Sequence, residues 1–258
     1  SPPYTAERKA FLYESFLYKF KKLRMFVTSI EKAITGGVTC DHAMNRRCKV
    51  IKCGLRVYVV RHQQRAPENA RFSSPLIDAG LKGAKTKTLE KLKNLGVTAV
   101  YSSPFVRVLQ TIQPFLDLKA ETSENGETGK LFEAKIEYSL YEHPNPDDFD
   151  VGYVQDEWYE AFSLDRTYRS FLAPMDLPAL NGTIGDVHTR TSNFLKYVVE
   201  QHRCSGEIDE VEVVLLASHQ TTVHSLLHQC NSIPMEELNF EQGDVAELQW
   251  KNVVQLVP

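Results

Sequence analysis

The chain has 258 residues, 42% of them hydrophobic, which is enough to bury a large core and fits one main domain better than several small ones. Its 30 Lys and Arg against 33 Asp and Glu give a formal net charge of −3, which excludes a general polycation for nucleic acid and an acidic disordered tail. The apolar run from Val213 to Ala217 is far shorter than the roughly 20 residues of a membrane-spanning helix, so we expect no membrane association.

The N-terminal residues have the pattern of one long amphipathic helix over 5–35. Apolar residues such as Leu12, Phe16 and Phe20 recur at steps of three and four, and Gly36 and Gly37 can end the helix. We therefore divide the chain into 1–52, an amphipathic helix with its connector, and 53–258, the main domain. The apolar stripe favours docking on the chain's own domain; the alternative is a surface for a protein partner or a second copy.

The five cysteines are an odd number in a chain large enough to fold without disulfides, which favours a reducing compartment and a cytoplasmic location. Cys40, His42, Cys48 and Cys53 lie close together in the connector and raise the alternative of a zinc site. Their spacing matches no paired C-x-x-C ligand pattern, so we expect scattered thiols and no bound metal.

Helical and strand-like segments alternate through the main domain. We expect strands at 55–60, 98–102, 135–139 and 212–217, helices at 78–95, 105–116, 184–202 and 221–230, and two short strands near 246–257. This alternation is typical of βαβ units and predicts an α/β fold with a largely parallel sheet. Residues 121–130 have the composition of an exposed loop, and residues 143–182, rich in Pro, Asp and aromatic residues, that of an irregular insertion that could form a lid.

Three of the predicted strands end in groups that can bind an anion. Arg61 and His62 follow the first strand with Arg65 close behind, Arg107 lies in the first turn of the helix after the second, and His219 follows the strand 212–217. The carboxyl ends of parallel strands meet at one edge of a sheet, where open α/β folds bind ligands. Because the guanidinium fork matches phosphate oxygens, the sequence predicts a phosphate pocket at this edge.

These strand ends resemble the motifs of the histidine phosphatase (phosphoglycerate-mutase-like) superfamily. The family's Arg-His-Gly appears as Arg-His-Gln at 61–63, its Ser-Pro-x-x-Arg-x-x-Gln-Thr at 103–111, and its late strand ending in His at 218–219. Ser-Pro-Leu-Ile-Asp-Ala-Gly at 74–80 is similar to a family helix start. The resemblance runs from about residue 55 to the C-terminus and implies a three-layer α/β fold with helices on both faces of the sheet.

Within the superfamily, the chain is most similar in pattern to the phosphatase domain of the Sts (suppressor of T-cell receptor signalling) proteins and the insect ecdysteroid-phosphate phosphatases. The segments 72–76, 165–169 and 248–250 carry this likeness. It implies a phosphomonoesterase for a phosphotyrosine protein or a small phosphorylated metabolite, and it makes a homodimer plausible.

The resemblance also implies a mechanism that needs no metal or other cofactor. His62 would attack phosphorus in line and form a phosphohistidine, which water then hydrolyses. Four cationic or imidazole groups would hold the phosphoryl oxygens and offset their charge: Arg61, Arg65, Arg107 and His219.

A carboxylic acid must protonate the leaving oxygen, and the resemblance places it just after the third strand, where Glu142 lies. Asp147, Asp148 and Asp150 lie close behind, so the alternative for Glu142 is a solvated loop carboxylate. The Sts pattern has an aromatic residue after this Glu, whereas this chain has a histidine. Four other histidines of this domain are expected to be structural or exposed: His143, His188, His224 and His228.

Two glutamines depart from the family pattern. Gln63 stands where a glycine normally lets backbone and phosphate approach closely, and Gln220 follows the second histidine, where relatives often have Gly or Ala. These amides could narrow the pocket, donate hydrogen bonds to phosphate, or turn away. The sequence favours an active phosphatase; the alternative is a pseudophosphatase that serves as a binding or scaffolding module, and a phosphoglycerate-type mutase is a third hypothesis.

Overall fold

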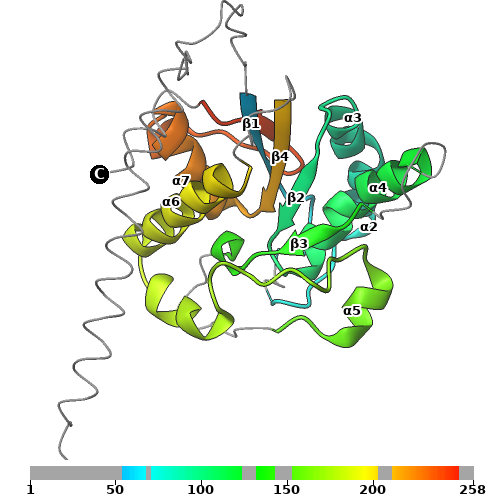
Figure 1. Cartoon of the computed structure of the whole chain (residues 1–258), viewed down its shortest axis with the longest axis horizontal. Coiled ribbons are helices and arrows are strands. Elements are labelled where there is room, and N and C mark those ends of the chain that lie inside the picture. Colours follow the sequence, from blue (N-terminus) through cyan, green and yellow to red (C-terminus); the bar gives the residue numbers. More distant parts are fainter. Residues whose placement is uncertain (1–53, 68–70, 124–131, 143–152, 203–210, 250–258) are drawn as a thin grey trace, which may run out of the picture.

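The computed structural model describes residues 54–67, 71–123, 132–142, 153–202 and 211–249 (Figure 1). The predicted N-terminal helix, the connector with its cysteines, most of the loop 121–130 and the start of the insertion lie outside these residues. The proposed boundary between residues 52 and 53 therefore stays a prediction.

Five strands form one sheet in the order β3-β2-β4-β1-β5. The strands are β1 (Gly54–Arg61), β2 (Ala99–Ser102), β3 (Ala134–Ile136), β4 (Val211–Ser218) and β5 (Val245–Glu247). The first four run parallel to one another, and only β5 pairs in the antiparallel direction, along β1. The sheet is thus mostly parallel, as the alternation of segments predicts.

The central strands are apolar on both faces because helices cover both. In β1, Val57 and Val59 belong to one core cluster, whereas Tyr58 and Val60 belong to the other. Successive side chains of a strand point to opposite faces, so this uninterrupted apolar run fits a strand buried on both sides.

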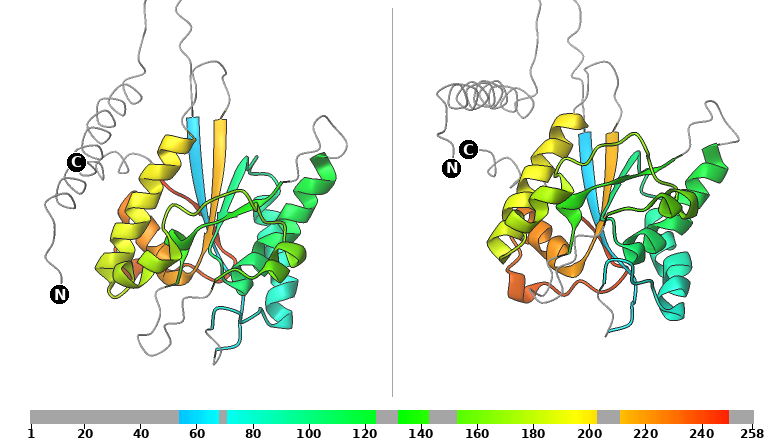
Figure 2. Two further views of the ribbon diagram at one scale, coloured as in Figure 1. Left: turned by 60° about the horizontal axis from the view of Figure 1, so that its bottom comes forward. Right: turned by 90° about the horizontal axis from the view of Figure 1, so that it is seen from below.

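Two groups of helices form the outer layers. A helical stretch composed of α2 (Asp78–Gly83), the π-helical segment η1 (Ala84–Thr88) and α3 (Leu89–Leu92) lies with α4 (Val106–Ser123) on one face. The other face is covered by α6 (Ile184–Gln201) and α7 (Gln220–Asn231). Figure 2 shows both groups with the strands between them. The three-layer α/β fold is confirmed.

The predicted strand 135–139 is too long. The strand β3 ends at Ile136, and Tyr138–Leu140 form the 3-10 helix η2. The carboxylate of Glu137 causes the change of direction, because it accepts a hydrogen bond of 2.8 Å from the backbone N–H of Ser139 and caps η2. The predicted helix 105–116 is too short, since α4 continues past Pro114 to Ser123.

The described part of the insertion is irregular, as expected. It contains the short helices α5 (Asp156–Ala161) and η4 (Pro174–Leu180), and Leu164 makes a single parallel bridge to Ala134 of β3. Glu137 anchors this segment, because its buried carboxylate also accepts hydrogen bonds from the Tyr168 hydroxyl (2.7 Å) and the Phe171 N–H (2.8 Å).

Within the described part of the chain, we find no helix that combines the length and the apolar character needed to cross a membrane.

Candidate active site

The register of the sheet brings three predicted site segments together. Arg61, the last residue of β1, pairs with Ser218, the last of β4, and Ser102 of β2 pairs with Ala217. The residues that follow these strands therefore leave the sheet side by side at its carboxyl edge. The backbone N–H of His62 still donates to the Ser218 carbonyl (3.0 Å), which fixes the point where β1 ends.

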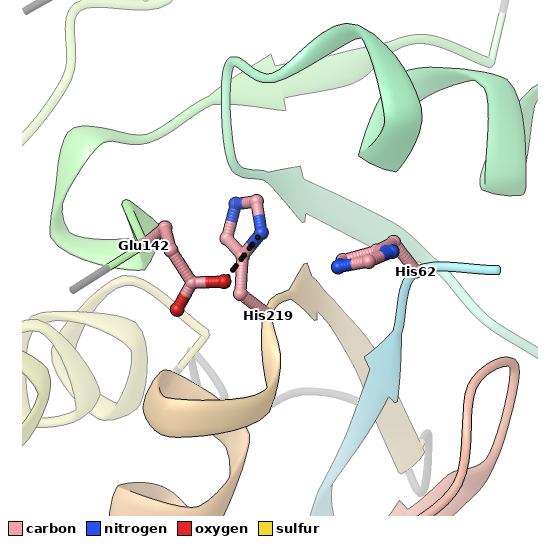
Figure 3. A group of neighbouring side chains, drawn as sticks. All are labelled: His62, Glu142 and His219. Atoms are coloured by element: carbon pink, nitrogen blue, oxygen red, sulfur yellow. Dashed lines mark ion pairs between the residues drawn. The ribbon is translucent and has the colours of Figure 1, made fainter. Parts of the chain in front are cut away.

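His62 is buried, and its ring orientation is set by its neighbour. Its Nδ1 lies 2.7 Å from the carbonyl oxygen of Gln63, which can only accept, so Nδ1 carries the proton and Nε2 keeps its lone pair. The His62 and His219 ring centroids are 5.3 Å apart. Figure 3 shows the ring of His62 pointing toward His219. The arrangement presents a neutral imidazole nitrogen to the site.

His219 is fully buried and has polar partners at both ring nitrogens. Its Nε2 lies 2.8 Å from the hydroxyl of Ser103, and its Nδ1 lies 3.2 Å from a carboxylate oxygen of Glu142, the pair marked in Figure 3. The Arg107 guanidinium lies 3.3 Å from the same Nδ1. Nδ1 of His219 thus lies close to both the cationic Arg107 and the anionic Glu142.

Arg107 is the central cation of the site and is only 1% exposed. Its Nη2 lies 4.0 Å from Glu142, its Nη1 donates to the carbonyl of Arg71 (3.0 Å), and its guanidinium lies 4.3 Å from the centre of the Phe105 ring. Burial lowers the pKa of Arg107 to about 10, which leaves the group charged at neutral pH.

Burial, with the nearby Arg65, lowers the pKa of Arg61 and of Arg107, and both Arg61 and Arg65 donate hydrogen bonds to backbone carbonyls. Arg61 donates to the Phe240 carbonyl (2.7 Å), and Arg65 to the carbonyls of Ala66 (2.7 Å) and Pro67 (3.0 Å). The buried Nε of Arg61 has no hydrogen-bond partner among the described residues. Both cations border the site, and Arg61 is close enough to Glu142 for their charges to interact.

Burial keeps both histidines neutral at physiological pH. Burial, with the nearby His219 and Arg107, lowers the pKa of His62 to about 2. Burial also lowers the pKa of His219 to about 4, although Glu142 acts in the opposite direction. A neutral His62 is the form in which an imidazole is nucleophilic.

Glu142 is ionised in the same state. Burial alone would favour the protonated acid, but the contacts with His219 and Arg107 lower the pKa of Glu142 to about 2. A negative group placed beside the carboxylate would oppose these contacts and raise its pKa.

Gln63 turns its side chain away from these groups. Its Nε2 donates to the hydroxyl of Thr88 in η1 (2.7 Å), and its side chain fills space that a Cβ on Gly83 or Gly243 would occupy. Its backbone N–H donates to the hydroxyl of Thr111 (2.9 Å). Of the three possibilities for Gln63, the structure shows the one in which the side chain turns away. Gln220, the first residue of α7, is exposed.

The structure adds residues that sequence reasoning did not assign. Ser103 and Thr111 lie within the 103–111 motif, and Thr111 is one helical turn from Arg107 and donates to its carbonyl (2.7 Å). Arg190 and Asn181 contact the backbone next to Glu142. In the sequence, Arg190 and Asn181 appear only as polar residues on, or just before, an amphipathic helix.

The other described histidines lie outside the group. His188 contacts the Ser225 hydroxyl (2.7 Å), and His228 the Ile233 carbonyl (2.8 Å). His62, Glu142 and His219 offer ligand atoms within 4.8 Å of one another, a set of two imidazoles and one carboxylate that zinc also favours. The candidate site therefore has the groups for either phosphoryl transfer or metal binding.

Comparison with known proteins gives a family match and structural neighbours. The chain resembles a Bombyx mori ecdysone phosphate phosphatase complexed with tungstate, at 17% identity and TM-score 0.50, over 76% of this chain and 86% of that one. It also resembles a Bacillus anthracis phosphoglycerate mutase, at 16% identity and TM-score 0.49, over 79% of this chain and 95% of that one. No curated protein sequence matches.

The family model of the histidine phosphatase superfamily (branch 1) matches residues 57–252, well over half of the chain. This span begins in β1 and takes in every residue of the site described above. The chain therefore belongs to the histidine phosphatase superfamily.

Proposed function

We propose that the protein is a phosphomonoesterase that works through a phosphohistidine on His62. The observation that carries the proposal is the 2.7 Å contact between Nδ1 of His62 and the Gln63 carbonyl, from which we infer that Nδ1 carries the proton and that the Nε2 lone pair is available near His219 and the charge of Arg107. A neutral nucleophile next to a buried cation suits attack on an anionic phosphorus centre.

In the first step, Nε2 of His62 forms a bond to phosphorus while the bond from phosphorus to the ester oxygen breaks. Glu142 gives its proton to the departing oxygen, so an alcohol leaves and a carboxylate remains. In the second step, water attacks phosphorus, Glu142 takes the water's proton, and the P–N bond electrons return to His62. Inorganic phosphate is released, Glu142 gives up to solvent the proton that it gained on substrate binding, and the protein returns to its starting state.

Glu142 must gain its proton before the first step, since its pKa is about 2 without ligand. A bound phosphate dianion supplies negative charge next to Glu142 and engages Arg107, which otherwise favours the carboxylate. Both effects raise the pKa of Glu142, so we expect substrate binding to take up a proton.

The test is the rate of hydrolysis of an aryl phosphate by the intact chain, with and without a metal chelator. We expect turnover that the chelator leaves unchanged, and a loss of roughly 10⁴-fold or more in His62→Ala. An acid-labile phosphoryl group should be trapped on the parent but not on the variant. Equal rates for parent and His62→Ala would overturn the proposal, and phosphoryl transfer to an added phosphate ester instead of water would indicate a mutase.

For the substrate, we propose a phosphotyrosine protein or a small phosphorylated metabolite, and for the setting a cytoplasmic homodimer. These finer proposals rest on the Sts-like segments and on the odd number of cysteines. Comparison of kcat/KM for a phosphotyrosine peptide and for sugar phosphates would separate the substrate classes, and light scattering of the intact chain would measure its mass.

A further inference from the structure

The backbone that carries Glu142 is held by side chains from other parts of the fold. The Leu140 carbonyl accepts from the Ser218 hydroxyl (2.6 Å), and the Tyr141 carbonyl accepts from the Thr222 hydroxyl (2.8 Å). Arg190 of α6 adds one hydrogen bond to the Ser139 carbonyl and one of 2.7 Å to the Tyr141 carbonyl. Asn181, just before α6, donates to the Glu142 carbonyl (2.9 Å). Every carbonyl from 139 to 142 thus has a side-chain donor.

Two of these contacts fix both peptide groups that flank the Cα of Glu142. Arg190 holds the carbonyl before it, and Asn181 holds the carbonyl after it. The backbone dihedrals of Glu142 are therefore set from both sides, and with them the direction in which its side chain leaves the chain. Asn181 also accepts from Arg190 (2.9 Å), so the two side chains act as one unit.

Arg190 carries a cost that packing alone does not explain. Its side chain is 1% exposed, and within the described ranges no carboxylate lies at ion-pair distance from it. Burial lowers the pKa of Arg190 to about 10, although Glu142 and Glu137 act at longer range to raise it. A buried cation whose direct hydrogen bonds go to neutral oxygens is unfavourable unless those bonds are well formed, and an apolar residue could fill the same space.

We propose that Asn181 and Arg190 are positioning residues that hold Glu142 at the reacting oxygen. The inference rests on the proposed function, in which Glu142 is the proton donor. Asn181 ends the insertion and precedes α6, so it joins the insertion to the segment that carries the acid.

The first test compares substrates whose leaving groups differ in basicity. A poor leaving group such as an alkoxide needs the proton from Glu142, whereas nitrophenolate leaves without it. We expect Asn181→Leu to lower kcat roughly 10- to 100-fold for an alkyl phosphate and less than about 3-fold for nitrophenyl phosphate. Thr191→Val, which removes a buried hydroxyl one residue from Arg190 with no contact to 139–142, should leave both rates unchanged.

A double-mutant cycle adds a second readout. In a Glu142→Gln background, Asn181→Leu should cause no further loss, because the group that it positions is gone. An equal loss with both substrates, or a full additional loss in the Glu142→Gln background, would overturn the inference. If Asn181→Leu does not fold, Arg190→Lys takes its place, since lysine keeps the charge but cannot bridge the Ser139 and Tyr141 carbonyls.

An activity-independent arm separates the inference from the proposed function. The pKa of the Glu142 carboxyl, followed by carbon NMR on the intact chain, should rise in Asn181→Leu from about 2 toward its ordinary value, because the carboxylate moves away from His219 and Arg107. An unchanged pKa would overturn the inference. A parent chain inert toward all phosphate esters would overturn the proposed function alone, and the NMR result would still decide the positioning role.

Discussion

At the scale of single residues, the site depends on which groups stay neutral. His62 and His219 lie among cations and apolar rings, so both lose the proton that an exposed imidazole would bind below its ordinary pKa. The charged groups beside the two histidines are Arg107 and Glu142, whose opposite charges offset each other when no ligand is bound. In the proposed mechanism, a bound phosphate ester therefore meets a His62 that needs no deprotonation before it attacks.

These shifted groups predict how stability changes with pH. The unfolded chain binds protons on His62 and His219 below about pH 6.5, while the folded chain resists until pH 4 or lower, so acid favours unfolding. We expect the thermal midpoint to fall as pH decreases from 7 to 5. A His62→Gln, His219→Gln double variant should show a smaller fall over this window, and an identical fall in both proteins would contradict the two shifts.

At the scale of secondary-structure elements, the residue after His62 is coupled to the helical stretch 78–92. The Gln63 side chain lies against Gly83, where an added Cβ would stand 2.7 Å from its Oε1, and it donates to Thr88 in the π-helical segment. Gly80 has a different constraint, since a Cβ there would lie 2.2 Å from the backbone oxygen of Gln64. The Gln63 side chain therefore favours glycine at 83, and the Gln64 backbone independently favours glycine at 80.

This coupling predicts an effect that changes sign. Gly83→Ala should destabilise the parent by about 1 kcal/mol, because the Gln63 amide must give up its hydrogen bond, but should stabilise a Gln63→Gly background by up to about 1 kcal/mol through helix propensity. Urea denaturation would give both free energies of unfolding. Gly80→Ala is the matched control and should destabilise in both backgrounds; Gly83→Ala effects of one sign would contradict the coupling.

Sequence reasoning located the parts of the site that follow directly from a strand. His62 and His219 directly follow strand ends and Arg107 lies in the first turn of the helix after β2, and parallel pairing brings the ends of these strands to one edge. The α/β fold class could be predicted from the alternation of helical and strand-like segments along the chain. The direction of Gln63 could not be predicted, because it depends on Thr88 and on Gly243 far away in the chain.

The side chains that donate to the carbonyls of residues 139–142, next to Glu142, could not be predicted either. The donors come from β4, α6, α7 and the segment before α6, and nothing in a single sequence distinguishes a buried Arg190 from the exposed arginine expected on an amphipathic helix. The end of β3 was missed for a similar reason, since Glu137 turns the chain by accepting from Ser139 and from residues of the insertion.

At the scale of the whole molecule, the site joins elements from both halves of the described chain. His62 follows β1, Arg107 lies in the first turn of α4 and His219 follows β4, so a ligand that contacts all three links segments that are distant in sequence. A ligand that binds only the folded state stabilises all of them together.

Vanadate binding should therefore raise the thermal midpoint of the entire domain. At 100 times its dissociation constant, vanadate adds about 2.7 kcal/mol, which corresponds to a shift of roughly 5 °C or more for a chain of this size. We expect Arg107→Met to lose the shift and Arg56→Met, which breaks an exposed ion pair with Glu247 and a contact of the guanidinium with the Tyr58 ring, to keep it. A shift that Arg107→Met retains would place the anion elsewhere.

The slot around Gln63 also constrains how the sequence can diverge. Gly243 has φ +74°, a backbone conformation that favours glycine whatever residue stands at 63, and a Cβ there would also lie 1.9 Å from the Gln63 amide. At 83 the constraint comes from Gln63, because an added Cβ would displace the amide from its hydrogen bond to Thr88. A sequence with glycine at 63 should therefore tolerate other residues at 83 more readily than one with glutamine at 63, whereas glycine at 243 should be favoured in both.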